Sequence, residues 1–293
     1  LLNESGFASF SAAADSALSL DQDLFTEESY RPLGEILAEM GSMDPESMMP
    51  SEIVDIKKRL QAAMDGLQLK DTNRSLKALY HMDEAKGDVI ANAVQGYDAR
   101  FINGQYMRMG TPFGRGAYMY EKNQNYISLA DSPIAGLDNF TVNGWFKPQL
   151  YLDNEVTDTE DDFTHVRGTP KQVLVADKGG NLVLSLQQRK LVLEISDGTK
   201  TETLKADQEF AMEQVTGGES RQAWNHFSVL RSGDTFALYL NGTKMGEVSL
   251  TGVTIGDSLT IGAKLNEENA RELQYNGLVD EFAFYGAELT EEE

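Results

Sequence analysis

The chain has 293 residues, and its 25 Lys and Arg against 47 Asp and Glu give a formal charge of −22. So negative a charge argues against nucleic-acid backbones, which basic side chains must neutralise, and against anionic lipid surfaces. The absence of cysteine excludes disulfides, thiolate zinc sites and a cysteine nucleophile. The length predicts about two domains, and 41% hydrophobic residues are enough for folded cores.

The residues given predict neither a membrane-spanning helix nor a signal peptide. No stretch approaches the ~18 apolar residues of a membrane-spanning helix. The first residues, LLNE, lack the basic and apolar regions of a signal peptide. Because residues 289–293 stop within a pattern, we expect a fragment of a longer protein.

Residues 1–70 predict a three-helix bundle. Apolar side chains recur at the 3- and 4-residue spacing of amphipathic helices in three segments. The stripes are Phe7, Phe10, Ala14 and Leu18; Tyr30, Leu33, Ile36, Leu37 and Met40; and Ile53, Ile56, Leu60, Met64 and Leu67. Thr26 and Ser51 precede the second and third stripes and are the expected N-caps.

From residue 75 onward the pattern changes to short β-rich runs separated by turn residues. The runs lie at 76–80, 125–129, 140–142, 173–175, 182–184, 191–195, 227–230, 236–240 and 278–284. Asn241-Gly242 is a strong hairpin signal, because both residues tolerate positive φ. We therefore predict a bundle over 1–70, a polar linker over 71–74, and an antiparallel β-sandwich over 75–293.

Six segments in order resemble the laminin-G-like, concanavalin A-like jelly-roll family. They are LYHMDE at 79–84, NYISL at 125–129, FTVNGWFKP at 140–148, WNHFSV at 224–229, LYLNG at 238–242, and IG at 261–262 followed by GLVDEF at 277–282. The resemblance implies a jelly-roll sandwich and places Trp145 and Trp224 within strands that face the core. His226 matches a strand position and is interpreted as structural.

The first part of the chain resembles the FIVAR module, a helical unit of exported, mostly Gram-positive, bacterial enzymes. The segments that carry this resemblance are FTEESY at 25–30 and LQAAMDGL at 60–67, within about residues 7–69. Together the two resemblances imply an accessory region of a large exported carbohydrate-active enzyme or surface protein, secreted or attached to the cell surface.

Catalysis by the jelly roll itself is not expected. Jelly-roll glucanases carry two catalytic Glu residues and an intervening Asp on one strand, spaced E-x-D-x-x-E or E-x-D-x-E. The nearest candidate, EDDFTH at 160–165, lacks the second Glu and lies in a polar run that is typical of a loop. The acidic run at 153–162 could bind calcium but lacks EF-hand spacing, so we interpret it as a solvated loop.

The family resemblance implies one structural Ca²⁺ between the loop after the first strand and the closing strand. Asp280 matches the closing position, and Asn92 stands at the early position, where the family usually has an Asp. Asp83 and Asp88 are nearby alternatives. The candidate calcium ligands are therefore Asp83, Asn92 and Asp280.

Tyrosines near predicted loops are the candidate sugar-stacking residues, because a carbohydrate site needs an aromatic face beside hydrogen-bonding groups. The candidates are Tyr97, Tyr106, Tyr118 and Tyr151, with Tyr120 and Tyr126 as further possibilities. Four basic residues, Arg100, Arg108, Arg115 and Lys122, either line a pocket for an acidic sugar or are scattered surface charges.

The leading hypothesis is a non-catalytic, carbohydrate-associated region that binds a glycan or acts as a spacer beside a catalytic domain of the same chain. A neutral glycan is favoured over an acidic one. One alternative is a structural or protein-binding adhesin module without sugar affinity, and another is an unrecognised glycoside hydrolase.

Overall fold

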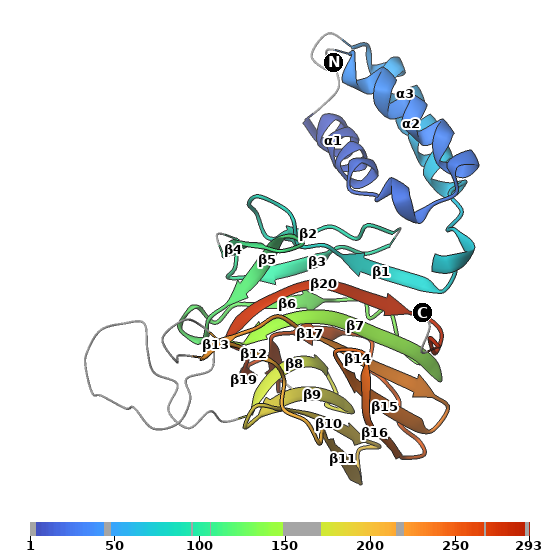
Figure 1. The fold of residues 1–293 in the computed structure, drawn as a ribbon. Helices are drawn as coiled ribbons and strands as arrows, with labels where there is room; N and C mark the ends of the chain where they lie inside the picture. Colours follow the sequence, from blue (N-terminus) through green and yellow to red (C-terminus); the bar gives the residue numbers. More distant parts are fainter. Residues whose placement is uncertain are drawn as a thin grey trace.

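Three helices precede two stacked antiparallel β-sheets in the computed structural model of the chain (Figure 1). The structure describes residues 4–43, 48–94, 96–105, 107–148, 171–214, 220–266, 268–290 and 293. The predicted fold class, a helical bundle followed by a jelly-roll sandwich, is confirmed. No helix among these residues is long and apolar enough to cross a membrane.

The bundle consists of α1 (Glu4–Leu18), α2 (Glu27–Gly41) and α3 (Pro50–Asp65), with a short 3₁₀ turn, η1 (Gln22–Leu24), between the first two helices. Its buried core is made of Phe10, Ala17, Leu20, Phe25, Leu33, Ile36, Ile53, Ile56 and Leu60. Leu18, expected on the buried stripe, is instead 65% exposed, and Ala17 takes the inward position.

The two predicted N-caps have different outcomes. Thr26 caps α2 as predicted, its hydroxyl oxygen accepting a hydrogen bond from the Ser29 backbone N–H. The Ser51 prediction is wrong, because α3 already begins at Pro50, whose fixed φ suits the first helical position. Met49 precedes it, and its backbone N–H donates to the Glu52 carboxylate at 2.7 Å.

The first sheet contains eight strands in the described part of the chain. Its order is β16 (Thr243–Ser249), β15 (Thr235–Leu240), β14 (Asn225–Ser232), β7 (Asn139–Pro148), β20 (Gly277–Tyr285), β5 (Gly114–Met119) and β4 (Arg108–Thr111), and β1 (Leu76–Tyr80) pairs with the end of β20. Asn241 and Gly242 connect β15 to β16 with φ of 49° and 77°, as the hairpin signal predicts.

Among the described residues, the second sheet likewise contains eight strands. Its order is β11 (Thr201–Lys205), β10 (Lys190–Ser196), β9 (Leu182–Gln187), β8 (Gln172–Asp177), β17 (Leu259–Ile261), β6 (Tyr126–Leu129), β3 (Ala99–Ile102) and β2 (Val89–Ile90). Smaller elements are the hairpins of β12 (Met212–Gln214) with β13 (Ser220–Gln222) and of β18 (Ala263–Leu265) with β19 (Arg271–Gln274), and the 3₁₀ turns η2 (Asp71–Asn73) and η3 (Glu121–Asn123).

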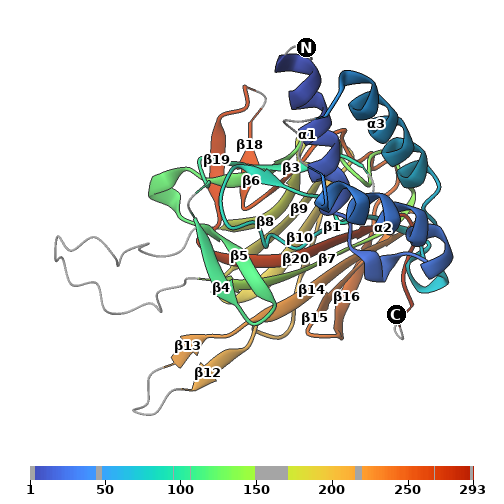
Figure 2. The ribbon, with the colours of Figure 1, turned by 90° about the horizontal axis from the view of Figure 1, so that it is seen from above.

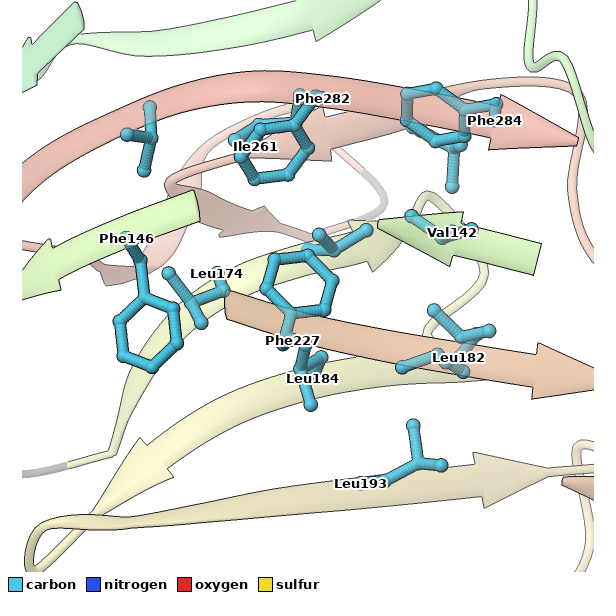
Figure 3. Packing of buried hydrophobic residues seen from close by; sticks show 14 of the residues in the cluster. Val142, Phe146, Leu174, Leu182, Leu184, Leu193, Phe227, Ile261, Phe282 and Phe284 are labelled. Atoms are coloured by element: carbon cyan, nitrogen blue, oxygen red, sulfur yellow. The ribbon is translucent and has the colours of Figure 1, made fainter. Parts of the chain in front are cut away.

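The main core lies between the two sheets (Figure 3). Phe146, Phe227 and Phe282 of the first sheet are fully buried there, and the rings of Phe227 and Phe282 meet edge to face at 5.5 Å. Leu174 and Leu184 enter the same core from the second sheet. Because strand side chains alternate between faces, every second residue of the first sheet points away from this core. We call that side the outer face.

The helical bundle packs on one corner of this outer face, beside β1 and β20 (Figures 1 and 2). Leu24 and Leu69 of the bundle contact a small apolar cluster formed by Leu76, Val94 and Ala283. The Asp21 backbone N–H donates to the Ala93 carbonyl at 3.0 Å. The bundle thus covers one corner of the outer face, and the site described next lies on the same face.

Candidate ligand-binding surface

The two tryptophans lie on the outer face of the first sheet and not in the core, which corrects the sequence-based expectation. Along β7, Val142 and Phe146 point into the core, so the alternation turns Trp145 outward. Trp224 is half-buried just before β14 and is likewise absent from the core. The alternation of apolar residues through β7 was the signal that could have placed Trp145 correctly.

Four ring side chains gather on this face, and we call them the aromatic belt: Phe113, Trp145, Trp224 and His226. The Phe113 ring lies 4.7 Å from Trp145 and 6.1 Å from Trp224, measured between centroids. Phe113 is 39% exposed, so the aromatic cluster reaches the protein surface. The four rings belong to three separate segments and form one continuous aromatic surface.

His226 is the link between the belt and a polar groove. Its ring lies 5.1 Å from Trp145, and burial lowers its pKa, so the imidazole is neutral near pH 7. The groove has a volume of about 190 Å³. It is lined by Thr141, Asn143, His226, Ser228, Leu230, Tyr239, Gly242, Leu289, Thr290 and Glu293.

Three polar side chains line the floor of the groove in a row across neighbouring strands. Asn143 of β7 is directly opposite Ser228 of β14, which is opposite Tyr239 of β15. Among the described residues the buried Oδ1 of Asn143 has no hydrogen-bond partner. An unpaired buried acceptor is costly, so this oxygen suits a ligand hydroxyl.

Asp280 lies beside the belt but is not open to solvent. It is opposite Trp145 in the ladder between β20 and β7, and it is fully buried. Its carboxylate accepts hydrogen bonds from the Thr111 hydroxyl at 2.5 Å and the Glu281 backbone N–H at 3.0 Å. Burial, with the nearby charges of Glu281 and Asp83, raises the pKa of Asp280 to about 7.

Of the predicted sugar-stacking tyrosines, Tyr118 lies on the same outer face. Tyr118 of β5 pairs with Leu278 of β20, and Leu278 pairs with Lys147 of β7. Lys147 is two residues after Trp145 on the same strand. The Tyr118 ring stacks on Tyr120 with centroids 6.3 Å apart. Tyr106, Tyr151 and the acidic run at 153–162 lie outside the described residues.

Tyr97 lines a different pocket, which we call the Tyr97 pocket. This pocket has a volume of about 530 Å³. It is lined by Lys77, Ala78, Tyr80, Asn92, Gly96, Tyr97, Asp131, Ser132, Pro133, Ala135 and Asp257. The structure therefore separates Tyr97 from Tyr118, which lies on the outer face.

The three candidate calcium ligands are only partly brought together. Asp83 lies close enough to Asp280 to raise its pKa. Asn92 is engaged elsewhere, because its Oδ1 accepts hydrogen bonds from the backbone N–H groups of Leu79 and Val94, both at 3.1 Å. Within the described ranges no group of three or more His, Cys, Asp or Glu side chains is placed to hold a metal. Since Ca²⁺ takes six to eight oxygens, Asp83 and Asp280 would need further oxygen ligands to hold the ion.

Two of the four basic residues considered for an acidic sugar are paired with carboxylates. The Arg108 side chain is 2% exposed, lying 3.6 Å from Glu84 and over the Phe101 ring. Arg100 instead pairs with Asp88 at the surface.

The comparisons with known proteins agree with this architecture. The family model of the concanavalin A-like lectin/glucanases superfamily matches residues 121–293. The chain belongs to this superfamily. No curated protein sequence matches the chain.

Similar solved structures include the binding domain of botulinum neurotoxin serotype D/C, at 12% identity over 75% of this chain and 50% of that one, with a TM-score of 0.52. A structure of botulinum neurotoxin type C, which interacts with two ganglioside molecules, matches at 11% identity over 75% and 50%, with a TM-score of 0.52. Domain 4 of an extracellular arabinanase from Geobacillus stearothermophilus, solved with arabinotriose, matches at 17% identity over 74% and 95%, with a TM-score of 0.49. This chain spans about half the length of the neurotoxin structures, and at 11–12% identity the likeness to them shows the fold alone.

Proposed function

We propose that this chain is a non-catalytic glycan-binding region of a larger exported protein, and that the aromatic belt with its polar groove is the binding surface. The observation that carries the proposal is the partly exposed cluster of Phe113, Trp145 and Trp224 beside an unpaired buried acceptor, Asn143 Oδ1. Aromatic rings together with a few placed polar groups are the combination that small-molecule sites use.

The chemistry follows from the arrangement of these groups. The apolar C–H face of a sugar ring stacks on an indole, which contributes contact area at little cost in side-chain entropy. Sugar hydroxyls then donate to Asn143 Oδ1 and exchange hydrogen bonds with Ser228 and Tyr239. Because His226 is neutral, the surface offers it as both a donor and an acceptor.

The extent of the surface favours a polysaccharide segment over a single sugar. From Tyr239 on β15 to Tyr118 on β5 the outer face crosses five strands. At ~4.8 Å between neighbouring strands, this span is about 19 Å. The formal charge of −22 favours neutral glycans, since uronates and sialates would be repelled.

The burial of Asp280 and its existing hydrogen bonds support a binding role without catalysis. A glycoside hydrolase needs two carboxyl groups that reach the substrate. Asp280, the carboxylate opposite Trp145, is fully buried and already accepts two hydrogen bonds. In the parent protein, the module would raise the effective concentration of a glycan near a neighbouring domain of the same chain.

Affinity electrophoresis in gels containing neutral polysaccharides tests the proposal, with arabinan, galactan, xylan, mannan and mixed-linkage glucan as neutral probes and polygalacturonate as an acidic one. We expect at least one neutral polysaccharide to retard the chain. Trp145→Ala and Trp224→Ala should each abolish the retardation, while Thr201→Ala, an exposed change on the second sheet, should leave it unchanged. Retardation that survives both tryptophan substitutions would disprove the assignment of the belt.

A further inference from the structure

We propose that the Tyr97 pocket is a second ligand site, which binds one unit of a neutral sugar independently of the aromatic belt. The proposal goes beyond the function assigned to the outer face, because its residues come from different segments. The lining residues come from β1, from Asn92, Gly96 and Tyr97, from the segment between Asp131 and Ala135, and from Asp257. Hydrogen-bonding groups that come from several segments can surround one sugar unit.

Tyr97 is the feature that first indicates a ligand. Its side chain is 68% exposed, the most exposed of the large apolar and aromatic residues in the described part of the chain. Its backbone is nevertheless fixed, because the buried Tyr80 hydroxyl donates to the Tyr97 carbonyl at 3.0 Å. An exposed ring on a fixed backbone is preorganised for stacking.

The rest of the pocket is equally fixed before any ligand binds. The Asn92 side-chain oxygen holds the loop by accepting hydrogen bonds from the backbone N–H groups of Leu79 and Val94. The backbone N–H of Asn92 itself donates to the Asp98 carboxylate at 3.0 Å. On the opposite wall, the Ser132 backbone N–H donates to the Asp257 carbonyl at 2.7 Å.

The bundle supports the same loop from its other side. The Asp21 backbone N–H donates to the Ala93 carbonyl, and Leu24 and Leu69 pack near Val94. Residues 93–94 are therefore held by the bundle, while Tyr97, a few residues further on, faces the pocket. The three-helix module thus helps to position a ligand loop of the sandwich.

The charges of the pocket select the ligand class. Asp131 and Asp257 accept hydrogen bonds from vicinal hydroxyls, and Lys77 donates one in return. Two carboxylates against one ammonium leave the pocket negative, which disfavours uronates and sialates. The volume of about 530 Å³ lies within the usual range for small-molecule sites.

The test is ¹⁹F NMR of the full chain labelled with 3-fluorotyrosine. The chain has 11 tyrosines, and the resonance lost in Tyr97→Phe identifies Tyr97. The probes are millimolar glucose, galactose, mannose, xylose and arabinose, with glucuronate as the acidic probe. We expect a saturable shift of the Tyr97 resonance with at least one neutral sugar and none with glucuronate.

Variants then separate this pocket from the aromatic belt. Asp131→Asn should weaken the sugar affinity measured from the Tyr97 resonance on the order of tenfold. Trp145→Ala, a change in the aromatic belt, should leave that affinity of the Tyr97 pocket unchanged. Gly96→Ala should also weaken binding, because its φ is +141° and a Cβ would lie 3.1 Å from Asn92 Nδ2. Gly87→Ala is the matched control, with a positive φ of +94° but nothing within 4 Å.

Two results would overturn the proposal. One is a Tyr97 resonance that no neutral sugar shifts, and the other is a shift that Trp145→Ala abolishes while Asp131→Asn leaves it intact. The aromatic belt is tested separately, with polysaccharides and tryptophan variants. A negative result for one site therefore does not decide the result for the other.

Discussion

Trp145 and His226 face each other across β7 and β14, with their ring centroids 5.1 Å apart on the outer face of the first sheet. The contact joins the aromatic belt to the polar groove, so the protonation state of one imidazole affects both. Burial lowers the pKa of His226, which means that the fold favours the neutral ring.

The stability of the chain should therefore fall in mild acid because of His226. The unfolded chain takes up this proton below its ordinary pKa of about 6.5, while the folded chain resists it to lower pH. The contribution is fully present above about pH 6.5 and is lost as the pH falls below it. Urea unfolding at several pH values should show a smaller loss in His226→Gln than in the unchanged chain; an equal loss would contradict the prediction.

Substitution of Gly144 should disrupt the core without touching the outer face. A Cβ at this position would lie 2.7 Å from the Phe282 ring and 2.8 Å from the Phe227 ring, both fully buried. Overpacking of this kind costs about 1–3 kcal/mol. Thermal unfolding of Gly144→Ala should show a clear drop in Tm, whereas Gly110→Ala, with nothing within 4 Å, should stay near the original value.

Arg231 should be among the costliest polar residues to remove. Its buried guanidinium donates to the carbonyls of Leu137, Gly233 and Val253 at 2.8–2.9 Å and lies over the Phe236 ring. Arg231→Met would leave these three carbonyls without a donor, at a cost of about 3 kcal/mol or more. Chemical denaturation measures this cost.

A surface arginine provides the comparison. Arg100→Met breaks an exposed pair with Asp88, and such pairs contribute about 0–1 kcal/mol. Similar losses in the two variants would show that the carbonyl contacts of Arg231 contribute little.

The calcium ion implied by the family resemblance remains a prediction, and Asp83 and Asp280 are the residues to test. Bound calcium would stabilise the fold by about 2.7 kcal/mol at a hundredfold excess over Kd. We expect EDTA to lower the Tm of the unchanged chain and to have no effect on Asp83→Asn. A Tm that does not respond to EDTA rules the ion out.

The sequence predicted the elements well, because their signals are local. The strand over 76–80 and the turn at Asn241-Gly242 appear where the alternation and the turn residues indicate. Trp145 was placed in the core because the family pattern outweighed the alternation of its own strand. The alternation around Phe146 indicated the correct placement, since neighbouring residues of a regular strand point to opposite faces.

Other features depend on contacts between distant segments and could not be read from local patterns. The Tyr97 pocket needs β1, two loops and Asp257 to meet, which brings together residues from Lys77 to Asp257. Likewise, Asn92 looked like a metal ligand until the fold showed its oxygen accepting from two backbone N–H groups.

The apolar contact between the bundle and the sandwich has a practical consequence for anyone producing the sandwich by itself. A protein shortened to begin at Ser75 would expose Leu76, Val94 and Ala283 to water at once. Such a patch favours aggregation, so low yield of the shortened protein would be expected even though every strand is retained. Polar replacements at these three positions would be the first remedy.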